Sequence, residues 1–159
     1  MLKQLLQPFA RGLSWYSDSA LLIFRIGLGG MFMWHGWPKI AGGPQAWAGL
    51  GKTMGVFGIA FAPVFWGFMS GFAEFGGGLL FALGLFYRPA CFLLFGNMMV
   101  AFSSQMIDGK GLAKASQSLE DGLSFFAAGF IGPGRYSLDH FIGIEETAEK
   151  KSHNIFVRK

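Results

Sequence analysis

The stretch LLIFRIGLGGMFMWHGWPKI, residues 21–40, is apolar enough to lie in a lipid bilayer, yet it contains an arginine, a histidine and a lysine. A central arginine costs about 2.5–3.5 kcal/mol on membrane insertion, so we expect Arg25 to face other helices and to have a partner. On a helix, Arg25 shares one stripe with Gly29, Phe32 and Gly36. Small residues on that stripe allow a second helix to approach closely. The stretch therefore predicts a membrane helix with a charged inner face.

The composition of the whole chain agrees with a membrane protein. Of its 159 residues, 52% are apolar and 14% are charged, whereas about a quarter are charged in a soluble domain. The net charge of +4 is modest, and no run of Lys and Arg is suited to tracking phosphates, so we expect lipid headgroups and not nucleic acid as partners. The single cysteine, Cys91, excludes an internal disulfide and a CxxC pair, and is expected to pack as a small apolar residue.

Apolar stretches along the chain predict an all-α membrane protein, a four-transmembrane-helix bundle with spans at about 19–37, 63–87, 90–107 and 119–131. An N-terminal amphipathic segment, 1–18, precedes this membrane domain over 19–139, and a polar tail, 140–159, follows it. A short interfacial helix is expected within 41–58, between the first two spans, and a polar loop over 108–118. Lys and Arg are more frequent on the side of the termini, which predicts that both termini are cytoplasmic.

The second predicted span supplies a carboxylate that can match the arginine. In GFMSGFAEFGGGLL, the glycines at 67, 71 and 78 share one helix face with Glu74, which is therefore expected to point inward. Consecutive spans are commonly antiparallel neighbours, so we predict an ion pair between Arg25 and Glu74, direct or through a water or another polar side chain. Such a pair either fixes the packing of the helices or forms a ligand or proton site.

The far end of the first span, WHGWPK, places His35 and Lys39 near a polar mouth of the bundle. Together with Glu74 they form the predicted ligand-binding group, suited to a quinone or another polar small molecule. An interfacial position without chemistry is the alternative for His35. Haem is disfavoured, because His140 and His153 lie in the tail on the predicted opposite side. No metal site and no intrinsic cofactor are evident.

Polar residues on the third and fourth spans are expected to make contacts between helices. These residues are Asn97, Ser104, Glu120 and Asp121. The sequence SLED, from Ser118, is typical of a helix start, in which the serine caps the helix and the acids suit its N-terminus. Alternatively, one acid lies beside the histidine and the lysine at the mouth.

Three stretches in order resemble the DoxX family of small bacterial membrane proteins. They are FRIGLGGMFMWHGWPKI (24–40), GFAEFGGGLLFALGLFYRPA (71–90) and GPGRYSLD (132–139). The matching polar positions are Arg25, His35, Lys39, Glu74, Arg88 and Arg135. The resemblance implies a four-helix bundle in the bacterial inner membrane. It also implies a link to redox work, because the family is named with a quinone-linked oxidoreductase subunit and some relatives are associated with oxidative-stress proteins.

Three functions follow from these features. The first is an accessory or quinone-interacting subunit of a membrane redox or oxidative-stress system, in which a redox partner subunit carries the cofactor, since this chain has no CxxC, flavin or nucleotide motif. The second is a binding or transport protein for a small solute or protons. The third is an assembly or scaffold subunit, within a complex or a homo-oligomer, that has no activity of its own. Whether the chain is an enzyme stays open.

Overall fold

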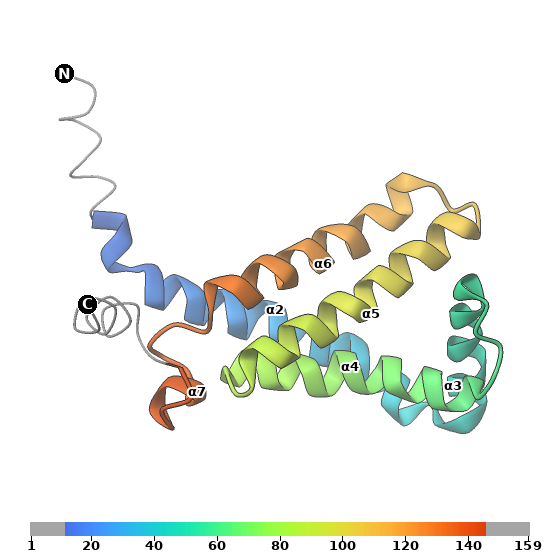
Figure 1. Ribbon diagram of the computed structural model, residues 1–159, viewed down its shortest axis with the longest axis horizontal. Helices are drawn as coiled ribbons and strands as arrows, with labels where there is room; N and C mark the ends of the chain where they lie inside the picture. The colour runs from blue at the N-terminus through green and yellow to red at the C-terminus, as the bar shows by residue number, and fades with distance from the viewer. Residues whose placement is uncertain (1–11, 146–159) are drawn as a thin grey trace, which may run out of the picture.

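The computed structural model describes residues 12–145, and the regular elements in this range are helices. Along the chain they are α2 (Ser17–Ala41), α3 (Gly43–Gly51), the 3-10 helix η1 (Lys52–Phe57), α4 (Pro63–Leu83), α5 (Tyr87–Ile107), α6 (Leu112–Ile131) and the one-turn α7 (Leu138–Phe141). The long helices α2, α4, α5 and α6 form the body of the molecule (Figure 1). Most of the predicted segments 1–18 and 140–159 lies outside the described residues.

Helices α2 and α4 pack through the two glycine-containing faces that the spacing predicts. The buried residues of α2 are Arg25, Gly29, Phe32 and Gly36, and those of α4 include all the small residues that share a face with Glu74. A Cβ atom added at Gly29 would lie 2.6 Å from the carbonyl oxygen of Gly78. The two backbones are therefore in direct contact, which explains why glycine is needed there.

Along the chain, α3 and η1 follow α2 and precede α4, which is where the sequence predicts a short helix. A Cβ atom at Gly67 would collide with the backbone carbonyl of Trp47, so α3 packs backbone to backbone on the first turns of α4. The first predicted span ends at about residue 37, whereas α2 continues through Pro38 to Ala41. Lys39 is consequently a helical residue and not part of a loop.

The helices differ in extent from the predicted spans, and α5 begins at Tyr87, three residues before the predicted start at 90. The span predicted over 63–87 ends at Leu83, because Gly84 takes a left-handed conformation (φ 65°) and stops α4. The loop predicted over 108–118 is shorter, since α6 already begins at Leu112 after a reversal made by Gly109 and Gly111, both with positive φ.

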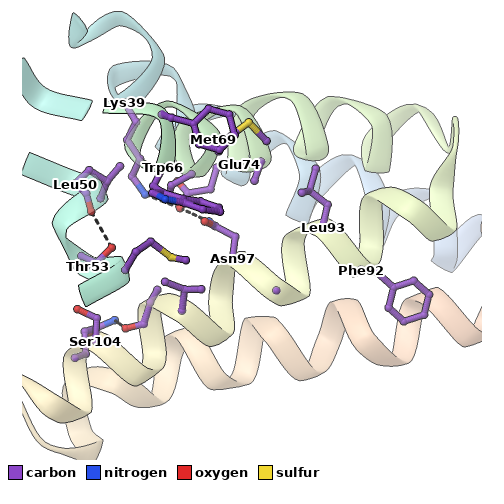
Figure 2. A pocket seen from close by; sticks show the side chains of 18 of the residues that line it. Lys39, Leu50, Thr53, Trp66, Met69, Glu74, Phe92, Leu93, Asn97 and Ser104 are labelled. Atoms are coloured by element: carbon purple, nitrogen blue, oxygen red, sulfur yellow. Dashed lines mark hydrogen bonds and ion pairs between the residues drawn. The ribbon is translucent and has the colours of Figure 1, made fainter. Parts of the chain in front are cut away.

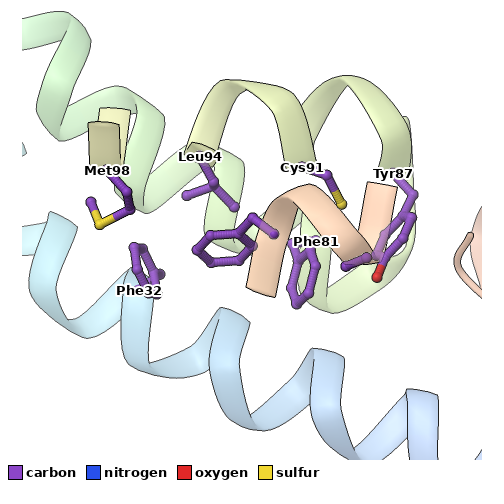
Figure 3. Packing of buried hydrophobic residues seen from close by; sticks show 8 residues of the cluster. Phe32, Phe81, Tyr87, Cys91, Leu94 and Met98 are labelled. Atoms are coloured by element: carbon purple, nitrogen blue, oxygen red, sulfur yellow. The ribbon is translucent and has the colours of Figure 1, made fainter. Parts of the chain in front are cut away.

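The apolar core lies where α4 turns into α5 and α6 returns beside them. It contains Phe32, Phe81, Tyr87, Cys91, Leu94, Met98, Phe125 and Ala128 (Figure 3). Cys91 is fully buried among apolar side chains, as predicted. From this end, α5 and α6 run away from α4 at an angle, and α3 and η1 lie at the wide end (Figure 1). This divergence allows a pocket to form beyond the core.

Candidate ligand-binding site

A pocket of about 590 Å³ lies between α4, α5 and η1, on the wide side of the angle between the helices. Its walls are largely apolar and include Met54, Phe65, Met69, Leu93 and Val100. Its polar lining comprises Lys39, Thr53, Trp66, Ser70, Glu74, Asn97, Ser104, Gln105 and Lys110. Figure 2 shows Lys39, Trp66, Glu74 and Asn97 gathered together, with Leu93 and Phe92 farther along α5. An apolar pocket with a few convergent polar groups is the usual form of a small-molecule site.

Glu74 is the centre of the polar group. Its side chain, near the middle of α4, is 5% exposed, and its Oε1 atom accepts hydrogen bonds from Lys39 Nζ at 2.5 Å and from Asn97 Nδ2 at 3.1 Å. The other carboxylate oxygen, Oε2, is buried and has no hydrogen-bond partner. Buried carboxylate oxygens strongly favour a donor, so Oε2 is the atom of this site most in need of one.

Lys39 reaches Glu74 because the α2 backbone passes close to α4 at this level. The Lys39 Cβ atom lies 3.1 Å from where a Cβ atom of Gly71 would be. The carbonyl of Lys39 accepts from Trp47 Nε1 at 2.7 Å, which ties the end of α2 to α3. The lysine side chain is 34% exposed. It therefore bridges the buried carboxylate and the pocket opening.

Trp66 is a site residue that the sequence analysis missed. Its indole Nε1 is buried without a hydrogen-bond partner and lines the same pocket. Trp66, Ser70 and Glu74 follow one another at steps of four on α4, so they share one side of the helix. That spacing is visible in the sequence and could have identified Trp66 as a residue on the same side of the helix as Glu74.

The predicted Arg25–Glu74 ion pair is corrected by the structure. Arg25 lies close to the end of α4, near Gly84, whereas Gly36 is the residue of α2 that packs against the backbone of Glu74. The guanidinium of Arg25 donates to the carbonyl oxygens of Pro133, Ala82 (3.2 Å) and Tyr136 (2.9 Å). Axial position decides this outcome, because α2 and α4 are antiparallel and Gly29 is level with Gly78.

The chain after α6 builds the surroundings of Arg25. Asp139 in α7 is 2% exposed, and its two carboxylate oxygens accept from the backbone N–H groups of Phe86 (2.9 Å) and Tyr87 (2.8 Å). It thereby caps the first turn of α5 from a distant part of the chain. The Tyr87 ring centroid lies 6.0 Å from the Arg25 guanidinium carbon. The GPGRYSLD stretch thus has a structural role: it connects α2 to the start of α5 at one end of the bundle.

Among the other predicted site residues, Asp121 of α6 lies within electrostatic reach of His35 of α2, as the alternative to a helix-capping role expects. His35 is exposed on α2 and does not line the pocket. Glu120 is exposed and Asp121 is half-buried within α6, so neither stands at a helix start. Ser118 does not cap α6, because it lies inside the helix and accepts from Gln105 Nε2 at 2.9 Å. Asn97 and Ser104 line the pocket, and Asn97 makes the expected contact between helices.

Two further arginines of the quoted stretches hold the ends of helices. Arg88 donates to the carbonyl of Gly129 at 2.6 Å and pairs with Glu145, so the start of the predicted tail packs back on the bundle. Arg135 pairs with Asp18 at 3.0 Å. The backbone N–H and guanidinium of Arg135 hold the pKa of Asp18 below its ordinary value of 3.8. Within residues 12–145, no cluster of His, Cys, Asp and Glu has the form of a metal site.

Comparison with known proteins adds one finding. No curated protein and no solved structure matches the chain. The sequence model of the DoxX family matches residues 20–105, more than half of the chain, a range that includes Lys39, Trp66, Glu74 and Asn97. The chain therefore belongs to the DoxX family.

Proposed function

We propose that this membrane protein binds an amphiphilic small molecule, in the first place a quinone, as an accessory subunit of a membrane redox system. The observation that carries the proposal is the buried Glu74 carboxylate, one oxygen of which has no partner, in the lining of an apolar pocket of about 590 Å³. Quinones combine an apolar ring and chain with two polar oxygens, which suits such a lining. A redox partner subunit would supply the electron-carrying cofactor.

The same proposal includes four membrane spans, with both termini on the cytoplasmic side of the bacterial inner membrane. Among the described residues, two helices are long and apolar enough to cross a membrane, α4 and α5. Helix α2 has 25 residues and α6 has 20, lengths of about 37 and 30 Å at 1.5 Å per residue. Arg25, the central charge of α2, is buried, which supports an orientation of α2 along the other helices in the bilayer.

Filling the pocket tests the proposal. Gly96 lines the pocket, and a Cβ atom added there meets nothing within 4 Å, so Gly96→Phe places a ring in the cavity without a backbone collision. In protein reconstituted into lipid nanodiscs, we expect saturable binding of a short-chain quinone by the wild type, measured by calorimetry. Gly96→Phe should weaken this binding at least tenfold.

The matched control is Gly30→Phe, because Gly30 is exposed on α2 and its Cβ position is also open. This variant should bind the quinone as the wild type does. Equal binding by wild type and Gly96→Phe would place the quinone elsewhere. No saturable binding by the wild type would contradict the proposal and favour a scaffold subunit.

A second candidate, passage of protons or a small polar solute, is favoured by the polar side chains that continue along the pocket. Ser104, Gln105 and Lys110 line it beyond Asn97, toward the loop between α5 and α6. Proteoliposomes with an internal pH-sensitive dye test this candidate. Flux above that of empty liposomes, and its loss in Glu74→Gln, would support transport, whereas equal rates in both preparations would reject it.

A further inference from the structure

The carboxylate of Glu74 offers a ligand only hydrogen-bond acceptance. Its ion pair with Lys39 requires the ionised form, and an ionised carboxylate carries no donor. Oε1 is already engaged by Lys39 and Asn97, while Oε2 is buried without a partner. A ligand atom that approaches Oε2 must therefore bring a hydrogen.

The indole of Trp66, in contrast, requires a hydrogen-bond acceptor. Nε1 is a donor only, and it too is buried without a partner in the lining of the same pocket. Trp66 lies two steps of four residues before Glu74 on α4, and both side chains line the pocket (Figure 2). The lining of the pocket thus contains an unused donor and an unused acceptor.

We infer that this pocket recognises a hydroxyl group on an apolar ring, as in a phenol or a hydroquinone, in preference to the corresponding ether or carbonyl. A hydroxyl group supplies the hydrogen that Glu74 Oε2 lacks, and its oxygen can still accept from a donor such as Trp66 Nε1. An ether or carbonyl oxygen can accept from the indole but has no hydrogen to offer the carboxylate. The inference rests on the proposed quinone site and deepens it, because it assigns the tighter binding to the reduced member of the quinone couple.

A pair of ligands that differ in one hydrogen-bond donor tests the inference without redox chemistry. We would titrate wild-type protein in nanodiscs with 4-nonylphenol and with its methyl ether, 4-nonylanisole, by calorimetry. The phenol should bind about tenfold tighter or more, because a hydrogen bond to a charged acceptor is lost in the ether. A short-chain quinol should likewise bind tighter than its quinone under anaerobic conditions.

Variants assign the preference to particular atoms. Glu74→Gln should reduce the phenol preference to about threefold or less, because an amide can turn either a donor or an acceptor toward the ligand. Trp66→Phe should weaken the phenol and the ether by similar factors, because both ligands carry an oxygen that accepts from the indole. Glu120→Gln is the matched control, since Glu120 is exposed and outside the pocket, and it should keep the full preference.

The outcomes separate the inference from the proposed function. Equal affinities of the wild type for the phenol and the ether would overturn the inference while leaving the quinone site intact. A preference that persists in Glu74→Gln would also overturn it. Failure of all four ligands to saturate the wild type would instead overturn the proposed function. The wild-type comparison decides the matter even if a variant does not fold.

Discussion

Arg25 and Glu74 are both buried charged residues on glycine-containing helix faces, yet their surroundings differ in kind. Three backbone carbonyls, contributed by α4 and by the chain after α6, surround the Arg25 guanidinium. Glu74 has one oxygen engaged and one unpartnered, next to a pocket. Backbone carbonyls engage both terminal nitrogens of Arg25 and leave only its Nε unpartnered, so this charge chiefly stabilises the fold, although Arg25 also borders a second, largely apolar cavity. One of the two carboxylate oxygens of Glu74 is unpartnered, so this charge can meet a ligand in the larger pocket. We therefore assign a structural role to the surroundings of Arg25 and a ligand-binding role to those of Glu74.

The largest expected effect is on the Arg25 side of the comparison. Arg25→Met leaves the carbonyls of Ala82, Pro133 and Tyr136 without their donor, and an unsatisfied buried polar group costs about 1–3 kcal/mol. We expect the free energy of unfolding in detergent, followed by tryptophan fluorescence, to fall by about 3 kcal/mol or more. Arg135→Met, which removes an exposed ion pair, should cost less than about 1 kcal/mol. Equal losses of stability in the two variants would contradict the structural role assigned to Arg25.

A smaller effect on stability is expected at Glu74. In Glu74→Gln, the amide oxygen still accepts from Asn97 and Lys39, and the half-exposed lysine keeps access to the pocket opening. Because Lys39 is 34% exposed and can remain hydrated, we expect the free energy of unfolding to change by less than about 1 kcal/mol, while binding of the phenol weakens. A loss as large as that of Arg25→Met would show that Glu74 is primarily structural and would remove the contrast. Unfolding and calorimetry on the same preparation measure both quantities.

The smallest effect concerns the ion pair between Asp18 and Arg135, at the Arg25 end of the bundle. The folded-state pKa of Asp18 lies below 3.8, so this carboxylate stabilises the fold above about pH 4, and the contribution disappears as the pH falls through the folded pKa. Asp18→Asn should be slightly less stable than the wild type at pH 6, and the difference should shrink as the pH falls below 3.8. Thermal unfolding of both proteins across this pH range is the measurement. A difference that is independent of pH would exclude the charge as its cause.

The sequence predicts a large part of the fold because helical periodicity is a local property. It correctly assigns the buried stripe of Arg25, Gly29, Phe32 and Gly36, and it correctly turns Glu74 inward. It misplaces the start of α6, because the polar composition of residues 112–118 is typical of a loop although their side chains are compatible with a helix. Only the packing of α6 on α5, which includes the bond from Gln105 to Ser118, shows that this polar turn is helical.

Helical spacing and the cost of burying a charge are enough to predict which faces of the helices are buried and which charged residues lie inside the bundle. Tertiary structure alone decided the partners of those charges. The axial offset of α2 against α4, fixed where Gly29 meets Gly78, places Lys39 beside Glu74 and takes Arg25 to the bundle end. Periodicity contains no information about that offset, since sliding one helix by a turn leaves its buried face unchanged.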